Sequence, residues 1–260
     1  MTAVDFEAFV ERLANVAGEA VMPFFRTSIG VENKAGRGFD PVTAADHAGE
    51  AAMRQLIKVT FPNHGVIGEE FGSEGDGAEY VWVLDPIDGT RGFITGLPTW
   101  GTLIGLLKSG APVYGMMSQP FTKERFFGDG GSARYRGPLG DRRLRTRPCA
   151  TIEQAIMSAT SPRIFTGDDL TAFERLEAVT RTTRYGGDCY AYCMLAAGQI
   201  DLVVETDLKP YDIVALIPII EGAGGVVTDW NGGPASNGGR VIAAGDKRVH
   251  AAAMEILNKA

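Results

Sequence analysis

Cysteine and histidine are scarce in this chain of 260 residues, with three of each. The cysteines, Cys149, Cys189 and Cys193, include no Cys-x-x-Cys pair, and three residues do not make a disulfide framework. Cys189 and Cys193 stand four residues apart in an expected helix, so we interpret them as a reduced pair in the core. The histidines show no metal-ligand spacing and are expected at the surface or as capping residues.

Long apolar runs and a basic excess are also absent. No stretch of about 18 uninterrupted apolar residues occurs, which excludes a membrane span. Residues 1–5 show neither a basic region nor the apolar run of a secretion signal. The net charge of −7 opposes the phosphate backbone of a nucleic acid. The sequence therefore predicts a cytoplasmic protein with no membrane or nucleic-acid partner.

Two motifs that would suggest other chemistry are missing or incomplete. No Gly-x-Ser-x-Gly is present, which argues against an acyl hydrolase. The glycines at 128, 130 and 131 lack the third glycine of a dinucleotide-binding loop and are interpreted as a hairpin turn. The arginines at 142, 143, 145 and 147 are interpreted as a solvated charge run beside a strand rather than an anion site.

Apolar spacing predicts one amphipathic helix over residues 6–24 and a second over residues 43–59, which Pro62 ends. Between them, residues 33–41 are polar and contain glycine, so we expect a mobile loop or hairpin. Short β-like runs, separated by Gly and Pro turns, follow at 65–68, 80–84, 99–108, 113–119 and 124–128. This pattern is typical of an α+β arrangement.

From about residue 144 the pattern alternates between strands and helices. The predicted strands are 155–158, 184–185, 201–205, 225–230 and 241–244, and the predicted helices are 168–180, 188–197, 211–222 and 247–257. Pro218 falls inside one of these helices, which it is expected to kink or delay. No repeat or long linker divides the chain, so we expect two parts, residues 1–143 and 144–260, that share a continuous interface.

Acidic residues lie at one terminus of each of three separate predicted elements. One strand leads into Asp85 and Asp88, another short apolar run ends at Glu69, and Asp212 lies at the start of a predicted helix. Carboxylate oxygens on rigid element ends, with water completing the coordination, are the ligands that Mg²⁺ prefers. The sequence therefore suggests a magnesium site, provided that the three elements converge.

The segment Asp85-Pro86-Ile87-Asp88-Gly89-Thr90 has further features of such a site. Pro86 fixes the turn so that both acids can face one centre, while Gly89 and Thr90 offer N–H groups and a hydroxyl for a phosphate. The alternative is structural, because an isolated Asp-x-x-Asp-Gly-Thr is often only a turn with a helix cap. Like charges repel unless a cation neutralises them, so convergence with Asp212 would favour the metal.

Three motifs in sequence resemble the inositol monophosphatase family of Mg²⁺-dependent, lithium-sensitive phosphomonoesterases. They are Gly68-Glu69-Glu70, the segment 85–90, and Tyr211-Asp212 followed by Glu221-Gly222-Ala223-Gly224-Gly225. The resemblance implies the layered α-β-α-β-α sandwich of the inositol monophosphatase and fructose bisphosphatase type, and a homodimer. The segments 88–96 and 186–192 are most similar to the histidinol-phosphate phosphatases of this family.

The resemblance also implies metal ligands. Glu69, Asp85 and the backbone carbonyl of Ile87 would hold a first Mg²⁺, and Asp85, Asp88 and Asp212 a second. A third, weaker ion would use Glu69 and waters near Asp46. The expected cofactor is therefore two or three Mg²⁺ ions.

Catalytic roles follow from the same resemblance. Thr43, Asp46 and Thr90 resemble the residues that orient the attacking water, and Glu69 belongs to the same catalytic group. Gly89 and Thr90 would bind the phosphate. Lys34 and Asp40 resemble residues of a mobile loop that closes over the metals, where Pro41 departs from the family pattern. The expected reaction is in-line attack of a metal-activated water on phosphorus.

Substrate contacts are expected from Asp188, Glu205 and Arg91. By alignment with the family, Asp188 replaces a small residue beside the substrate hydroxyls, and Glu205 stands where a substrate-binding acid is found. Two carboxylates facing the leaving group favour a cationic alcohol such as histidinol. Asp188 could equally be the N-cap of the helix predicted from residue 188.

The sequence thus predicts an enzyme, a phosphoric monoester hydrolase that acts on a small phosphorylated alcohol, with histidinol phosphate in histidine biosynthesis as the preferred substrate. The alternative is inositol 1-phosphate or a related sugar or nucleotide phosphate. A haloacid-dehalogenase-type phosphatase would need Asp-x-Asp-x-Thr, whereas the spacing here is Asp-x-x-Asp-Gly-Thr. A metal-bound interaction module without catalysis is disfavoured because the full set of acids and Thr90 is present.

Overall fold

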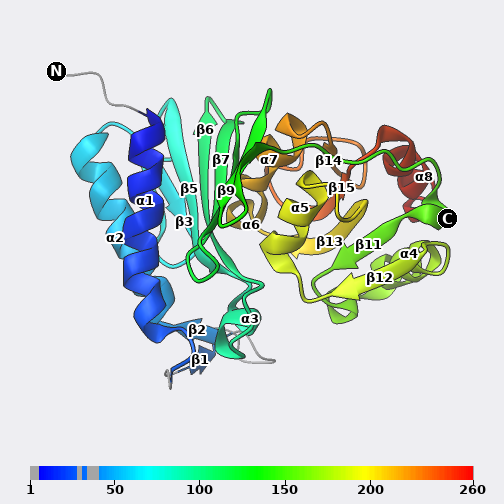
Figure 1. Ribbon diagram of the computed structural model, residues 1–260, viewed down its shortest axis with the longest axis horizontal. Coiled ribbons are helices and arrows are strands. Elements are labelled where there is room, and N and C mark those ends of the chain that lie inside the picture. The colour runs from blue at the N-terminus through cyan, green and yellow to red at the C-terminus, as the bar shows by residue number, and fades with distance from the viewer. Residues whose placement is uncertain (1–5, 28–30, 34–40, 260) are drawn as a thin grey trace.

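The computed structural model describes residues 6–27, 31–33 and 41–259, without the side chains of 31–33 and 41–43. Lys34 and Asp40, and the side chain of Thr43, therefore lie outside the described part. Two large sheets and three groups of helices stack as five layers in the order α-β-α-β-α (Figure 1). The predicted α+β class and layered sandwich are confirmed.

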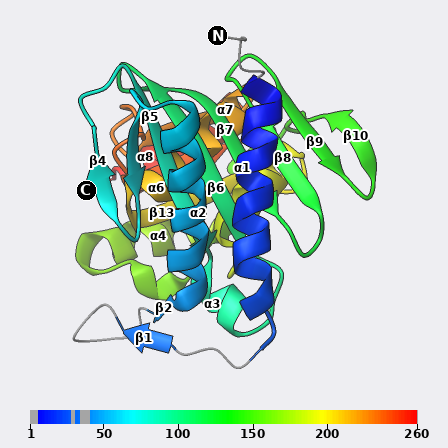
Figure 2. The same ribbon diagram turned by 90° about the vertical axis from the view of Figure 1, so that its left-hand side faces the viewer.

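Helices α1 (Phe6–Val21) and α2 (Ala44–Thr60) form the first layer, and η1 (Met22–Phe24) extends α1. The two helices lie side by side across one face of the first sheet (Figure 2). Their inward faces bury apolar side chains such as Phe9, Leu13 and Met53 against the sheet. This is the burial that the helical spacing of apolar residues predicts.

The first sheet has eight strands and supplies one wall of the site. In sheet order they are β10 (Gly140–Arg143), β9 (Ala133–Gly137), β8 (Glu124–Gly128), β7 (Ala111–Gln119), β6 (Gly101–Lys108), β5 (Tyr80–Asp88), β3 (Gly65–Gly68) and β4 (Gly72–Glu74). Only β3 and β5 pair in parallel among the strands of this sheet. Their parallel pairing ends at Gly68 and Leu84, so Glu69, which follows β3, and Asp85, which lies in β5, come next at the same edge.

The middle layer contains α5 (Asp188–Ala196), α6 (Pro210–Ile213) and α7 (Leu216–Gly222). These helices pack between the two sheets, and their apolar residues join residues of both sheets in the largest core cluster. The backbone of Ala215 approaches the first sheet so closely that a Cβ on Gly115 would lie 1.8 Å from its carbonyl oxygen. Glycine at 115 therefore allows α6, and with it Asp212, to sit directly on the sheet.

The second sheet and the outer helices complete the stack. The strands are, in sheet order, β12 (Thr182–Tyr185), β11 (Ile156–Ala159), β13 (Leu202–Leu208), β15 (Gly239–Ala244) and β14 (Val226–Asp229). Helices α4 (Gly167–Glu177) and α8 (Lys247–Leu257) cover its outer face. Short elements at η2 (Ile152–Gln154), η3 (Pro162–Ile164) and α3 (Thr90–Ile94) connect the larger ones.

Several predicted elements differ from the structure. The helix predicted over residues 211–222 is divided into α6 and α7, which is the interruption expected from Pro218. Proline lacks an N–H and clashes with the carbonyl four residues earlier, here that of Val214. As a result, Pro218 occupies the first turn of α7, where an N–H would have no partner within the helix. Strands β4, β9 and β10 were not predicted, because their sequences are polar and rich in glycine or arginine.

Strands β1 (Val31–Asn33) and β2 (Pro41–Thr43) pair as an antiparallel ribbon at the two ends of the segment for which a loop or hairpin is predicted. The first sheet ends at Arg143 and the second begins at Ile156. The division of the chain into parts 1–143 and 144–260 stays a prediction. Among the described residues, no helix is both long and apolar enough to cross a membrane.

The scarce residue types are placed mostly as expected. All three cysteines are buried thiols, which confirms the reduced pair Cys189 and Cys193. The surface or capping role predicted for histidine is wrong for His64, which is partly buried between aromatic rings and accepts a hydrogen bond from Trp82 Nε1 at 3.1 Å. It is also wrong for His250, whose ring lies 2.9 Å from the hydroxyl of Thr228.

Two other interpretations of loops can be compared with the structure. The glycines around residue 130 form the turn between β8 and β9, as predicted. Arg142 and Arg143 are exposed on β10, in agreement with a solvated charge run. Arg147 differs from this prediction, because its Nε and Nη2 donate to the buried carboxylate of Asp201, at 2.7 and 2.6 Å.

Candidate metal and phosphate site

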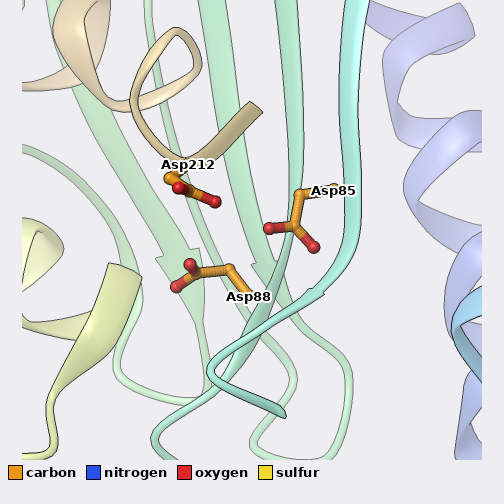
Figure 3. Close-up of side chains that lie close together, drawn as sticks. All are labelled: Asp85, Asp88 and Asp212. Atoms are coloured by element: carbon orange, nitrogen blue, oxygen red, sulfur yellow. The ribbon is translucent and has the colours of Figure 1, made fainter. Parts of the chain in front are cut away.

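Three carboxylates from two elements converge at the edge of the first sheet. Asp85 and Asp88 lie at the end of β5, and Asp212 lies in α6. One oxygen from each lies within 4.8 Å of the others. Figure 3 shows the three side chains around a common space, with Asp212 approaching from the middle layer. The structure thus brings together acids that are 127 residues apart in the chain, as the sequence motifs require.

The end of β5 is shaped by local hydrogen bonds. Its pairing with β6 shifts register between Asp85 and Asp88, which lets both side chains turn toward the same side. The Ile87 N–H donates to Asp85 Oδ1 at 3.0 Å, and the Thr90 hydroxyl donates to the Ile87 carbonyl at 3.1 Å. Gly89 follows with φ of 86°, a left-handed conformation that suits glycine. The segment 85–90 therefore forms a turn whose conformation is fixed by hydrogen bonds within it, one of them to the Asp85 carboxylate.

Asp212 is held by the backbone that precedes it. The Lys209 N–H donates to Asp212 Oδ2 at 2.6 Å, and the Asp212 N–H donates to the Lys209 carbonyl at 3.1 Å. Pro210 begins α6, where its fixed φ suits the first helical turn. This short helix therefore fixes the position of the Asp212 carboxylate opposite Asp85 and Asp88.

Burial and mutual repulsion make these acids hard to ionise without a cation. Burial is the main cause that raises the pKa of Asp85 and of Asp88 well above the usual range, and the neighbouring carboxylates add to it. Burial also raises the pKa of Asp212 to about 7, with repulsion from Glu69 contributing. A divalent cation would reverse this effect, because it favours the ionised form of every ligand.

The carboxylates open into a cleft of about 430 Å³. Its lining includes the predicted ligands and phosphate residues, namely Glu69, Asp85, Ile87, Asp88, Gly89, Thr90 and Asp212, and the predicted substrate residues Arg91, Asp188 and Glu205. A second hollow of about 630 Å³ shares five lining residues with this cleft, among them Arg91, Arg163 and Asp188. The site therefore has room for a leaving group beyond the phosphate.

Asp46 takes a different position from these cleft residues. It lies in the first turn of α2, is only 2% exposed, and adds to the repulsion that raises the pKa of Asp85. Among the described residues that line the cleft, Asp46 is not included. Its predicted role in orienting the attacking water stays a prediction.

Two further acids that line the cleft, Asp188 and Glu205, share one hydrogen-bond partner. Asp188 Oδ1 accepts a hydrogen bond from the Thr160 hydroxyl at 3.3 Å, and Glu205 Oε1 accepts from the Thr160 N–H at 2.6 Å. Burial raises the pKa of Asp188 to about 6 and that of Glu205 to about 8. The two carboxyl groups form an acidic part of the cleft lining, whose charge a bound cationic group could neutralise.

The alternative role of Asp188 as a helix cap is wrong. The N-cap residue of α5 is Gly187, and the Asp188 side chain accepts its hydrogen bond from Thr160 instead. The Cys189 N–H donates to Asp88 Oδ2 at 2.6 Å, so an acid of β5 caps this helix from the other half of the chain. The Asp188 backbone is left-handed, with φ of 43°. Its side chain is thereby directed to Thr160 and the cleft rather than to the helix end.

Sequence reasoning missed three residues that shape this site. Thr160 forms hydrogen bonds with both Asp188 and Glu205, and Arg163 lines both hollows. Glu50 is fully buried behind the turn that contains Glu69. A signal existed only for Glu50, which stands four residues after Asp46 and therefore on the same helix face.

Comparison with known proteins agrees with this geometry. The model of the inositol monophosphatase family matches residues 4–260. The chain belongs to the inositol monophosphatase family. The chloroplastic bifunctional phosphatase IMPL2 of Arabidopsis thaliana is 42% identical over 97% of this chain and 75% of its own length. A histidinol-phosphatase of Streptomyces coelicolor is 34% identical over 95% of this chain and 94% of its own length.

Solved structures support the same assignment. An inositol monophosphatase from Zymomonas mobilis has 39% identity and a TM-score of 0.86, covering 99% of this chain and 100% of its own. The Thermotoga maritima IMPase has 28% identity and a TM-score of 0.84, covering 98% and 97%. Because these relatives are phosphatases, the chain is a phosphoric monoester hydrolase, and the resemblance seen in its motifs is confirmed.

Proposed function

We propose that this protein is a Mg²⁺-dependent phosphomonoesterase whose substrate is histidinol phosphate. The observation behind the metal is the convergence of Asp85, Asp88 and Asp212 within 4.8 Å in the lining of the cleft. The observation behind the substrate is a second acidic pair that lines the same cleft, Asp188 and Glu205. Relatives named histidinol-phosphatase, at 33–35% identity, support the same substrate.

The residues present fit magnesium. Hard oxygen donors make up the cluster, and the ring nitrogens and thiols that favour zinc or copper are absent from the described residues that line the cleft. Asp85 and Glu69, with the carbonyl of Ile87, would hold one ion, and Asp88 and Asp212 would share a second with Asp85. Two or three ions are proposed, as in the sequence-based prediction. Bound Mg²⁺ would supply positive charge for the phosphoryl oxygens and lower the pKa of a coordinated water.

The chain's own groups orient the reaction. Thr90 holds the Ile87 carbonyl in place through its hydroxyl, and it lines the cleft beside Gly89. We assign these two residues to the phosphoryl group, because their backbone N–H groups can donate hydrogen bonds to its oxygens. Thr90 and Asp46, together with Thr43 and Glu69, are proposed to accept and direct the proton of the attacking water. No covalent enzyme intermediate is needed.

The leaving group is proposed to lie against Asp188 and Glu205. Histidinol has an ammonium group and an imidazole that titrates near neutral pH, and either can donate a charge-assisted hydrogen bond to a carboxylate. An approaching cation would lower the pKa of both acids and so ionise them. The site should therefore bind a substrate with a cationic leaving group more tightly than one whose leaving group is a neutral polyol.

A second candidate rests on the arginines at the rim. Arg91 and Arg163 line both hollows and could bind a second phosphate, as in a sugar bisphosphate or a nucleotide phosphate. Relatives from Aquifex aeolicus and Thermotoga maritima are named fructose-1,6-bisphosphatase/inositol-1-monophosphatase. Inositol 1-phosphate is the remaining alternative. Turnover of histidinol phosphate, inositol 1-phosphate, fructose 1,6-bisphosphate and adenosine bisphosphate, measured side by side, decides between them.

Metal removal should abolish phosphate release. An acidic cleft repels a phosphate, so the chelated protein has no means of binding its substrate in a reactive position. Readdition of Mg²⁺ should restore the rate. Millimolar lithium should inhibit it by competing for the second metal position, the one that Asp85, Asp88 and Asp212 would hold. Activity that survives exhaustive chelation, measured by phosphate release with and without EDTA, would refute the metal assignment.

Metal binding should be coupled to pH. The raised pKa of Asp212, about 7, and those of Asp85 and Asp88 mean that the metal-free site holds protons near neutral pH. These protons must leave when the ion binds, so the affinity should increase as pH rises from 6 to 8. Calorimetry in two buffers with different ionisation enthalpies measures the protons released. An affinity independent of pH over this range would contradict the pKa assignments.

The remaining expectations from the sequence are proposed here as well. A homodimer and a cytoplasmic location agree with the family resemblance and the composition. We expect no nucleic-acid or membrane partner, given the net charge of −7.

A further inference from the structure

A buried glutamate behind the site has no role in the mechanism described so far. Glu50 lies in α2 and has no exposed surface. Its Oε2 accepts the Glu70 N–H at 2.7 Å, and its Oε1 accepts the Phe71 N–H at 3.2 Å. Both donors belong to the tight turn between β3 and β4. One carboxylate therefore binds the backbone directly after Glu69, the proposed metal ligand.

Arg54 completes this contact from the next turn of α2. Its Nε donates to Glu50 Oε1 at 2.7 Å, and its Nη2 donates to the Gly72 carbonyl. The guanidinium neutralises the buried carboxylate and binds the far end of the same turn. A buried charge that is paired and fully hydrogen-bonded has a fixed position, because any shift would leave it unsatisfied.

The near end of the turn is fitted to the same carboxylate. A Cβ on Gly68 would lie 2.0 Å from Glu50 Oε1, so only glycine permits this approach. The Glu50 carboxylate thus lies against Gly68, directly before Glu69, and accepts the N–H groups of the two residues after it. Arg54 binds the carbonyl at the end of the turn. We call Glu50, Arg54 and Gly68 the turn clamp.

Helix α2 also connects the turn clamp to the proposed catalytic machinery. Asp46 lies one helical turn before Glu50, and both side chains are buried on the face of α2 that meets the first sheet. The same helix therefore sets the position of Asp46 directly and that of Glu69 through the turn. A rigid outer support of this kind commonly determines the affinity of a metal site.

We propose that Glu50 is a positioning residue for the metal site: its carboxylate holds the turn after β3 so that Glu69 faces Asp85. This inference rests on the proposed function in that Glu69 is taken as a metal ligand. Glu50 itself contacts neither substrate nor metal. Its contribution is therefore to metal affinity and not to the chemical step.

The test is Glu50→Gln in the full chain, titrated with Mg²⁺ by calorimetry after metal removal. A glutamine has one oxygen acceptor, so its NH₂ group must face one of the donors that the carboxylate now satisfies. The turn should shift, and the Mg²⁺ dissociation constant should rise roughly tenfold to a hundredfold. The Mg²⁺ concentration for half-maximal phosphate release should rise by the same factor, while kcat at saturating Mg²⁺ recovers to within a few-fold.

Asp201→Asn is the matched control. Asp201 is equally buried and also accepts from an arginine and a backbone N–H, those of Arg147 and Ile156, but at the opposite end of β13 from the cleft. It should lower thermal stability while leaving Mg²⁺ affinity unchanged. If both variants weaken Mg²⁺ binding equally, or if folded Glu50→Gln binds as the wild type does, the proposal is overturned.

Arg54→Lys provides a milder second variant if Glu50→Gln does not fold. It keeps the positive charge but loses the bond to the Gly72 carbonyl, so Mg²⁺ affinity should fall several-fold. Unchanged affinity in this variant would then overturn the proposal. Failure of the proposed function is distinguishable, because the wild type would bind no Mg²⁺ or release no phosphate at any Mg²⁺ concentration.

Discussion

Asp88→Asn should reduce Mg²⁺-dependent phosphate release by more than about a hundredfold while the chain remains folded. The substitution removes one of the three convergent charges, and the weaker ligand that remains does not hold the ion at the same position. The asparagine oxygen can still accept the Cys189 N–H that caps α5, so the local structure survives. Loss of a buried like charge should leave the metal-free variant at least as stable as the wild type.

Asp207→Asn is the control for this experiment. Asp207 lines the same cleft, but its side chain is 83% exposed and pairs with Lys209 at 2.8 Å. The same change in net charge should therefore leave the rate within a few-fold of the wild type. Phosphate release and thermal unfolding of both variants, with and without Mg²⁺, give the comparison. Near-normal turnover by Asp88→Asn at saturating Mg²⁺ would remove Asp88 from the metal site.

The acidic motifs could be predicted from the sequence because their geometry is local. Asp85 and Asp88 are three residues apart across a proline, so a single turn can bring both side chains to one side, and the register shift in the pairing with β6 completes this arrangement. The convergence of Asp212 is different. It depends on the close approach of α6 and α7 to the first sheet at Gly115, which no pattern within either segment reveals. The family resemblance predicted it where the physical pattern alone did not.

The outer support of the site could not be predicted for the same reason. Glu50 binds a turn 20 residues later, and Thr160 joins acids that come 28 and 45 residues after it. These hydrogen bonds exist only once the layers are packed. Asp188 illustrates the point, because an acid at the start of a helix predicts a cap, yet the capping hydrogen bond of α5 goes to Asp88 from β5.

The test of specificity must respect the backbone at Asp188. Its φ of 43° is left-handed, a conformation that asparagine tolerates and alanine does not. Alanine would therefore combine the loss of charge with backbone strain. Asparagine keeps the size of the side chain and its acceptor for the Thr160 hydroxyl at 3.3 Å. Asp188→Asn thus changes mainly the charge that faces the leaving group.

Asp188→Asn should lower kcat/KM for histidinol phosphate roughly tenfold to a hundredfold, which corresponds to about 1.5–3 kcal/mol for a hydrogen bond to a charged group. The loss should appear mainly in KM, because the cationic end of histidinol lies away from phosphorus and is bound equally in ground and transition states. Inositol 1-phosphate, which has no cation, should lose far less, and Asp207→Asn should not discriminate between the two substrates. Steady-state kinetics on both substrates provide the measurement. Equal losses on both, or faster turnover of inositol 1-phosphate by the wild type, would reject histidinol phosphate as the substrate while leaving the metal site as proposed.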